Sequence, residues 1–403
     1  MSKYLQLLAV CLLFSLQSFA GSAVQKDTLS YAGFYQIRGN INHTLSRISS
    51  KQQVTVAFLG GSITFNPGWR PMLCNYLQKR FPDVKFRFIA AGIPSLGSLP
   101  HAFRLQRDVL DSGRVDLMFI EAAVNDRVNK TDSLTQVRDL EGIVRHARRS
   151  NPAMDMILME FADPYKNADY DKGIIPAEIK NHELVASHYG LPSINLAKEV
   201  HDKIANGEFD WAKDFQDLHP AMFGQQLYVH NIQSLLEACW KAYQSRSKKA
   251  KAVALPSMLN KFSFTNGAYA DVSKATYTNG WKLSPDWSPA DQAGTRPGFV
   301  HVPVLENTAA DARLTFNFTG NAVGIAIVSG PDAGMISYAI DNGPYHQADL
   351  FTEWSSGLHL PWYLLLGSGL ANGNHQLHLK VLSQKNEQSK GVACRIVYFL
   401  YNR

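Results

Sequence analysis

Four short stretches of the sequence hold residues that could together transfer an acyl group. In chain order they contribute Ser62 (GGSIT), Gly92 (AAGIPSLGS), Asn125 (AAVND) and His219 (DLHP). A serine hydroxyl becomes nucleophilic when a neutral histidine accepts its proton. The oxyanion of the tetrahedral intermediate needs donors already in place, and the N–H groups of Ser62 and Gly92 with the side-chain amide of Asn125 could supply them. These residue types predict a serine hydrolase site with that oxyanion hole.

The histidine also needs a partner on its other nitrogen, which fixes its tautomer and orientation. Asp214 and Asp217 precede His219 by five and two residues. We favour Asp214, because a longer loop back to the imidazole is less strained than a contact from two residues away. A backbone carbonyl is the alternative, and it would leave a dyad of Ser62 and His219.

The first half of the chain must position these residues. Between about residues 50 and 245, short apolar strands alternate with helical stretches, which predicts a mainly parallel sheet covered by helices on both faces. Ligands bind outside the carboxyl ends of the strands in such sheets, and the candidate residues follow strand ends or precede the last helix. The predicted strands are Val54–Leu59, Phe86–Ala90, Leu117–Glu121, Met154–Met159 and Ser193–Asn195, and the predicted helices are Trp69–Arg80, Leu99–Asp111, Ser133–Arg149, Pro176–Tyr189 and Met222–Tyr243.

After about residue 255 the pattern changes to short strands separated by turn residues such as Asn279-Gly280. Strands and turns of this kind predict an antiparallel β-sandwich. We therefore place a catalytic domain at residues 26–247 and an accessory, jelly-roll-like sandwich at 255–403, with a basic linker at 246–251. The predicted strands of the second domain are Leu314–Phe318, Val323–Val328, Met335–Ile340, His375–Val381 and Cys394–Tyr401.

In their order, the four stretches resemble the blocks of the SGNH hydrolases, also called GDSL esterases, over about residues 50–245. The resemblance implies a three-layer α/β/α flavodoxin-like fold and cleavage of acyl esters without a metal or another cofactor. Many secreted two-domain members look like deacetylases of plant or microbial polysaccharides. Residues 329–351 resemble the β-domain appended to some of these esterases, whose loops would close one side of the active site.

The sequence departs from the family pattern at three positions. Gly61 stands where many members have aspartate, and Ala123 stands where the third block usually has glycine. Neither residue is a reacting group, so both changes are compatible with activity. Gln216 stands three residues before His219, where the family usually has its triad aspartate. The identity of the group that orients His219 is therefore the open question of the site.

Composition and the N-terminus restrict where the protein works and what it binds. Apolar residues make up 45% and charged residues 18% of the chain, as in an ordinary folded protein. Residues 1–20 place a positive charge before a short apolar run and a small-residue site, which predicts a cleaved signal peptide and a secreted or periplasmic protein without membrane insertion. The formal charge is +6, but the basic residues are scattered, so we expect no nucleic-acid partner. Cys74, Cys239 and Cys394 have no disulfide or zinc spacing and are expected in cores.

Several residues near the motifs also have structural interpretations. Ser62 alone could cap a helix after a Gly-Gly turn. Arg104 is expected at the surface, and Asp126 and Arg127 are expected to form an ion pair or a cap. Trp69 could pack on a helix face or line a pocket. Tryptophans of the second domain could stack on sugars, although core packing is favoured for them: Trp281, Trp287, Trp354 and Trp362.

The sequence therefore predicts a secreted carbohydrate esterase that removes small acyl groups, acetyl first among them, from a polysaccharide or oligosaccharide. A thioesterase or lysophospholipase would use the same triad. A rival interpretation is a glycan-binding protein that kept the esterase fold and lost the chemistry, which Gln216 favours. A third interpretation is a structural role in which the sandwich drives assembly. The sequence does not specify an oligomeric state.

Overall fold

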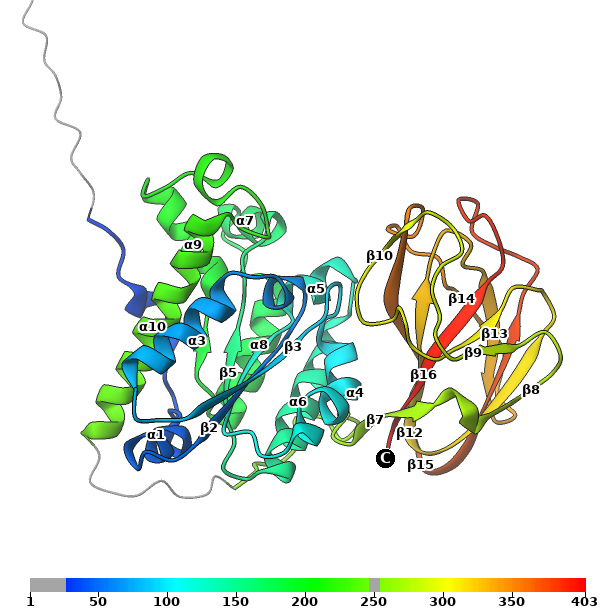
Figure 1. Cartoon of the computed structure of the whole chain (residues 1–403), viewed down its shortest axis with the longest axis horizontal. Helices are drawn as coiled ribbons and strands as arrows, with labels where there is room; N and C mark the ends of the chain where they lie inside the picture. Colours follow the sequence, from blue (N-terminus) through cyan, green and yellow to red (C-terminus); the bar gives the residue numbers. More distant parts are fainter. Residues whose placement is uncertain (1–26, 246–253) are drawn as a thin grey trace, which may run out of the picture.

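The computed structural model describes residues 27–245 and 254–403, which form two domains side by side (Figure 1). The expected signal peptide and the expected basic linker at 246–251 lie outside these residues. The first domain is built on one six-stranded sheet in the order β1-β6-β5-β4-β2-β3. Its strands are β1 (Tyr35–Gln36), β2 (Val54–Gly60), β3 (Phe86–Gly92), β4 (Leu117–Glu121), β5 (Asp155–Met159) and β6 (Ser193–Ile194).

The sheet has the strand order of flavodoxin. Strands β2 to β6 are parallel, and β1 pairs antiparallel with β6 at the edge. Along the sheet the parallel strands follow the order β3-β2-β4-β5-β6. The chain therefore changes its direction of winding between β2 and β4, and ligands of such sheets bind at that switch point. The predicted α/β fold class is confirmed.

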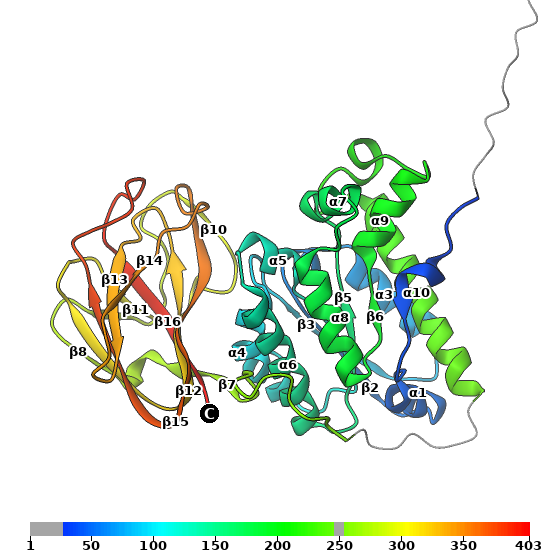
Figure 2. The same cartoon turned by 180° about the vertical axis from the view of Figure 1, so that it is seen from behind.

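Helices cover both faces of the sheet (Figure 2). Successive residues of a strand point to opposite faces, and both sets are buried here. Val56 and Phe58 face a buried cluster with α1, α3, α9 and α10. Ala57 and Leu59 face a second cluster with α4, α6 and α8. The helices are α1 (Asn42–Ser49), α2 (Ser62–Phe65), α3 (Trp69–Arg80), α4 (Ser98–Asp108), α5 (Ala123–Val128), α6 (Ser133–Ser150), α7 (Pro164–Asp171), α8 (Ala177–Tyr189), α9 (Leu196–Ala205) and α10 (Met222–Gln244), with 3-10 turns at Tyr31–Phe34, Leu110–Ser112 and Val272–Lys274 and a π turn at Trp211–Phe215.

The second domain is mainly antiparallel, as predicted. Two of the predicted strands, Leu314–Phe318 and Val323–Val328, are one long strand, β12, with a register shift at Gly320. The predicted strand His375–Val381 is the end of β15, which begins at Leu358. The strands are β7 (Gly267–Asp271), β8 (Ala275–Tyr277), β9 (Lys282–Ser284), β10 (Gly294–Thr295), β11 (Val304–Asn307), β12 (Arg313–Ser329), β13 (Met335–Ile340), β14 (His346–Asp349), β15 (Leu358–Val381) and β16 (Cys394–Asn402).

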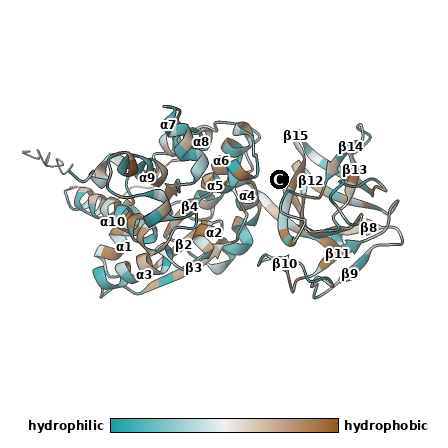
Figure 3. Cartoon of the chain, turned by 90° about the horizontal axis from the view of Figure 1, so that it is seen from above, coloured by the Kyte–Doolittle hydropathy of each residue, from teal (hydrophilic) through white to brown (hydrophobic). Residues whose placement is uncertain are grey.

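The two domains share one hydrophobic core. Helix α4 lies on the side of the first domain that faces the second (Figure 3). Phe103 on α4 packs against Phe264 with their ring centroids 5.2 Å apart. Both rings belong to the buried cluster that also contains Phe299 and Tyr363 of the second domain. The interface therefore resembles the interior of a single domain.

A buried carboxylate fastens the second domain to helix α6. Glu141 is fully buried, and it accepts hydrogen bonds from the N–H groups of Leu259 and Asn260 and from the hydroxyl of Ser263. A Cβ on Gly142 would lie 2.6 Å from the backbone oxygen of Phe264. Only glycine permits this approach, so the backbone at Phe264, which leads into the second domain, packs directly on α6.

The remaining core predictions can now be compared with the structure. Cys239 and Cys394 are buried and Cys74 is half-buried, and all are free thiols. Trp281 is buried in the core of the second domain, and Trp287 is buried in the core that both domains share. Trp354 is 45% exposed. Among residues 27–245 and 254–403, no helix combines the length and the apolar character that crossing a bilayer requires.

Candidate active site

Ser62 lies where β2 gives way to helix α2, beside the switch point of the sheet. Strand β2 ends at Gly60, and Ser62 begins a one-turn helix after Gly61. A Cβ on Gly61 would lie 2.1 Å from Nδ2 of Asn125, and a Cβ on Gly60 would lie 2.3 Å from Oγ1 of Thr64. The two glycines therefore make room for neighbours that a larger residue would displace.

His219 lies far from Ser62 in the sequence but contacts it in the fold. Its Nε2 lies 2.7 Å from Oγ of Ser62, a hydrogen-bond distance. The residue is placed by the loop between the π turn at Trp211–Phe215 and α10. Partial burial lowers the pKa of His219, the nearby Arg296 lowers it further, and Asp217 opposes both effects. The imidazole is therefore held towards its neutral form, which accepts a proton.

Neither candidate aspartate is hydrogen-bonded to His219 in the described part of the chain. Oδ2 of Asp214 accepts the N–H of Asp210 at 2.8 Å, within its own turn. Asp217 accepts the N–H of Leu218 and acts on His219 through its charge. Gln216 has a left-handed φ of 77° and ends the π turn. The charge of Asp217, unlike that of Asp214, acts on the His219 pKa, and the assignment of the orienting group stays a prediction.

The residues predicted to supply oxyanion donors lie beside the turn that carries Ser62. Asn125 lies on α5, after β4, and its amide Nδ2 would be 2.1 Å from a Cβ on Gly61, the residue before Ser62. Gly92 ends β3 and packs on helix α2, because a Cβ there would lie 2.5 Å from the backbone nitrogen of Phe65. Three segments far apart in the sequence thus meet at the carboxyl edge of the sheet, as the strand pattern predicts.

Two buried acidic side chains accept hydrogen bonds from the segments that follow β2 and β3. Oε2 of Glu121, at the end of β4, accepts the N–H of Gly61 at 2.9 Å. Oδ1 of Asp126 accepts the N–H of Ser98 at 2.7 Å and its hydroxyl at 2.9 Å. Burial raises the pKa of Glu121, and it raises the pKa of Asp126 to about 6. Sequence analysis missed Glu121, although a charged residue at the end of a buried strand is an unusual signal.

Arg104 corrects one prediction, because its side chain is fully buried and not at the surface. Its Nη2 donates to the carbonyl oxygens of Ala91 at 2.6 Å and Gly60 at 3.1 Å, and its Nη1 pairs with Asp108 at 2.8 Å. The α4 guanidinium thus donates to the carbonyls at the ends of β2 and β3, where the Gly60 carbonyl also accepts the N–H of Ile93 at 3.0 Å.

The other neighbours of the motifs have structural roles. Trp69 is fully buried, and its indole N–H donates to the carbonyl of Ile63 at 3.1 Å. Arg127 pairs with Asp169 at 2.5 Å, as expected of an ion-paired residue. Nowhere in residues 27–245 and 254–403 do three or more metal-ligating side chains gather in a group able to hold an ion.

Comparison with known proteins shows which family and which fold the chain resembles. The GDSL-like Lipase/Acylhydrolase family matches residues 58–227. A solved structure of a two-domain esterase (CEX) active on acetylated mannans has a TM-score of 0.74 and 21% identity, covering 93% of this chain and 98% of its own. The same esterase co-crystallised with mannopentaose gives a TM-score of 0.74 and 20% identity with the same coverage. At this identity the match shows that both domains share the fold. No curated protein sequence is significantly similar to the chain.

Proposed function

We propose that this chain, in which residues 58–227 belong to the GDSL-like lipase/acylhydrolase family, hydrolyses O-acetyl esters on a polysaccharide or oligosaccharide. The enzyme class is carboxylic ester hydrolase. The observation that carries the proposal is the 2.7 Å separation of Ser62 Oγ and His219 Nε2 at the switch point of the sheet. The fold shared with a two-domain esterase active on acetylated mannans supports a carbohydrate substrate.

In the proposed mechanism, His219 Nε2 takes the proton of Ser62 as Oγ attacks the ester carbonyl. The oxyanion accepts hydrogen bonds from the N–H groups of Ser62 and Gly92 and from the amide of Asn125. The protonated His219 returns its proton to the sugar oxygen, which leaves as a hydroxyl. Water, deprotonated by His219, then attacks the acyl-enzyme, and His219 returns the proton to Ser62 Oγ as the bond to the acyl group breaks and acetate is released. Each oxyanion donor contributes roughly 3–4 kcal/mol to lowering the barrier.

The orientation of His219 is the part of the mechanism that the family pattern leaves open. We propose Asp217 for this role, since its charge acts on the imidazole. No carboxylate is hydrogen-bonded to His219 in the described residues. The second candidate function is therefore a glycan-binding protein whose Ser62–His219 pair is a weakened catalyst. We further propose export through the N-terminal signal at residues 1–20, which fits an extracellular glycan substrate.

Acetate release tests the proposal. Purified mature protein and the Ser62→Ala variant are compared on acetylated mannan, acetylated xylan, acetylated pectin and p-nitrophenyl acetate. The expected result is release by the wild-type protein and a loss of more than about 1,000-fold in kcat for the variant. Equal background release from both proteins on every ester, with retained binding of the polymers, would establish the glycan-binding alternative.

A further inference from the structure

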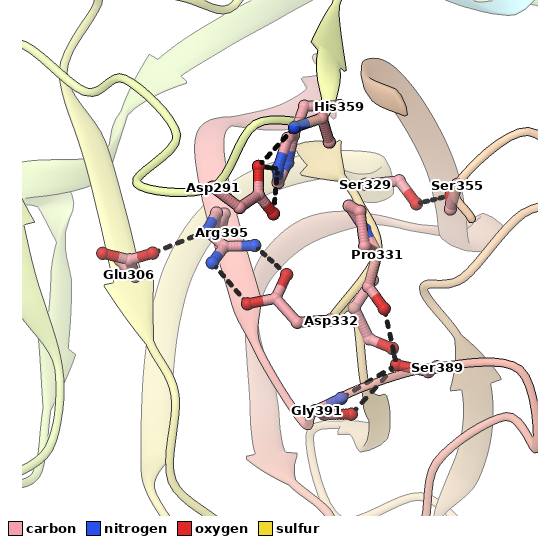
Figure 4. Close-up of polar contacts among 12 residues, drawn as sticks. Asp291, Glu306, Ser329, Pro331, Asp332, Ser355, His359, Ser389, Gly391 and Arg395 are labelled. Atoms are coloured by element: carbon pink, nitrogen blue, oxygen red, sulfur yellow. Dashed lines mark hydrogen bonds and ion pairs between the residues drawn. The ribbon is translucent and has the colours of Figure 1, made fainter. Parts of the chain in front are cut away.

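A segment of the second domain extends to the rim of the esterase site. We call residues 291–298 the strap. The carboxylate of Asp291 contacts Nε2 of the buried His359 at 3.0 and 3.1 Å (Figure 4). The N–H of Arg296 donates to the carbonyl of His359 at 2.8 Å, and β10 pairs in parallel with the start of β15. One histidine therefore holds the strap through both its ring and its backbone.

The other end of the strap rests on the first domain. A Cβ on Gly298 would lie 3.2 Å from Cγ2 of Ile93, the residue after Gly92. The next residue, Phe299, is fully buried in the core that both domains share. Because the strap is fixed at His359 and at Ile93, its middle has little freedom to move away from the site.

Arg296 lies in this fixed middle and has a free charge. Its side chain is exposed, and within residues 27–245 and 254–403 its guanidinium has no hydrogen bond or ion pair. It is near enough to His219 for its charge to act on the imidazole. Many other arginines of the chain do have acidic partners: Arg38, Arg47, Arg80, Arg104, Arg107, Arg114, Arg127 and Arg395.

An unpaired guanidinium at the edge of an active site fits a carboxylate, because its planar donors match both carboxylate oxygens. We propose that Arg296 binds a carboxylate of the substrate, so that the substrate is an acetylated glycan with a uronate close to the acetylated sugar. This inference rests on the proposed esterase function. The strap fixes the backbone of Arg296, which lowers the entropic cost of placing its side chain on a ligand.

Two forms of one substrate test the inference. Acetylated pectin is prepared with its uronates free or methyl-esterified, and acetate release is measured so that methyl-ester cleavage does not interfere. The wild-type enzyme should have a KM for the free-acid form lower by about 10-fold, the effect of one charged hydrogen-bonded contact. The R296A variant should lose this difference, and R296K should keep part of it. Added salt should raise the wild-type KM for the free-acid form alone.

The control is R313A, which removes an exposed arginine at the start of β12 and should leave the ratio of the two KM values unchanged. Equal KM values for both pectins in the wild-type enzyme, or an R296A effect of the same size on neutral acetylated mannan, would overturn the inference. Failure of the proposed function gives a different result. In that case the wild-type protein does not cleave p-nitrophenyl acetate or any polymer.

Discussion

Oε2 of Glu121 accepts the backbone N–H of Gly61 at 2.9 Å, one residue before the proposed nucleophile. The family commonly has an aspartate at the position of Gly61. Here a side chain at residue 61 would displace the Asn125 amide, since a Cβ would lie 2.1 Å from its Nδ2. The carboxylate nearest this turn is that of Glu121, at the end of β4. A glycine and a glutamate together thus set the spacing between Ser62 and Asn125.

Removing this carboxylate should lower turnover more than affinity. In E121A the N–H of Gly61 loses its acceptor, so the turn shifts and Ser62 moves relative to the oxyanion donors. We expect kcat to fall by about 100-fold with KM changed by less than about 3-fold. E121Q keeps an acceptor oxygen and should recover most of the activity. Steady-state kinetics of the two variants, with thermal unfolding as a control, measure this. Equal losses in E121A and E121Q would show that Glu121 has another role.

The pH dependence of kcat/KM should identify the carboxylate that acts on His219. His219 must be neutral to accept a proton, so activity falls as pH drops through its pKa, which burial places below the usual value of about 6.5. Asp217 raises this pKa, so D217N should move the acid limb to lower pH. The matched variant D214N should not move it. A shift in D214N alone would assign the role to Asp214.

Loss of Arg104 should destabilise the first domain. Its guanidinium is buried and donates to two strand-end carbonyls and to Asp108, so Arg104→Met would remove these hydrogen bonds from the interior. The Gly60 carbonyl would keep the N–H of Ile93, and Asp108 would keep Arg107. We expect a decrease of roughly 3 kcal/mol in the free energy of unfolding, measured by denaturant titration. The exposed Arg313→Ala change should alter it by less than about 0.5 kcal/mol. Unchanged stability in the Arg104 variant would show that water replaces the guanidinium.

The sequence predicts the first domain well because most residues of its central strands β2, β4 and β5 are apolar and buried. Strand β4 has the predicted bounds. Strands β2 and β3 begin where predicted and run slightly past their predicted ends, to Gly60 and Gly92. Buried polar residues are harder to predict. Arg104 occupies a helix position that periodicity alone cannot distinguish from a surface one. The second domain is also harder, since a bulge joins two predicted strands into β12.

The site is predictable where it follows strand ends and unpredictable where it depends on loops. Ser62, Asn125 and His219 meet as the motif order implies. The partner of His219 depends on a π turn and on a left-handed Gln216, and neither has a sequence signature. Arg296 comes from the second domain and belongs to no motif, so only the packing of the domains brings it to the site.

The shared core between α4, α6 and the sandwich has a consequence for engineering and inheritance. Many accessory domains are tethered modules that can be exchanged or deleted. Here a deletion at residue 245 would uncover Phe103 and leave the carboxylate of Glu141 without its donors from Leu259, Asn260 and Ser263. The truncated protein would expose an apolar surface and tend to aggregate. The two domains therefore constitute one unit of folding, in which a change on either side of the boundary must be accommodated by the other.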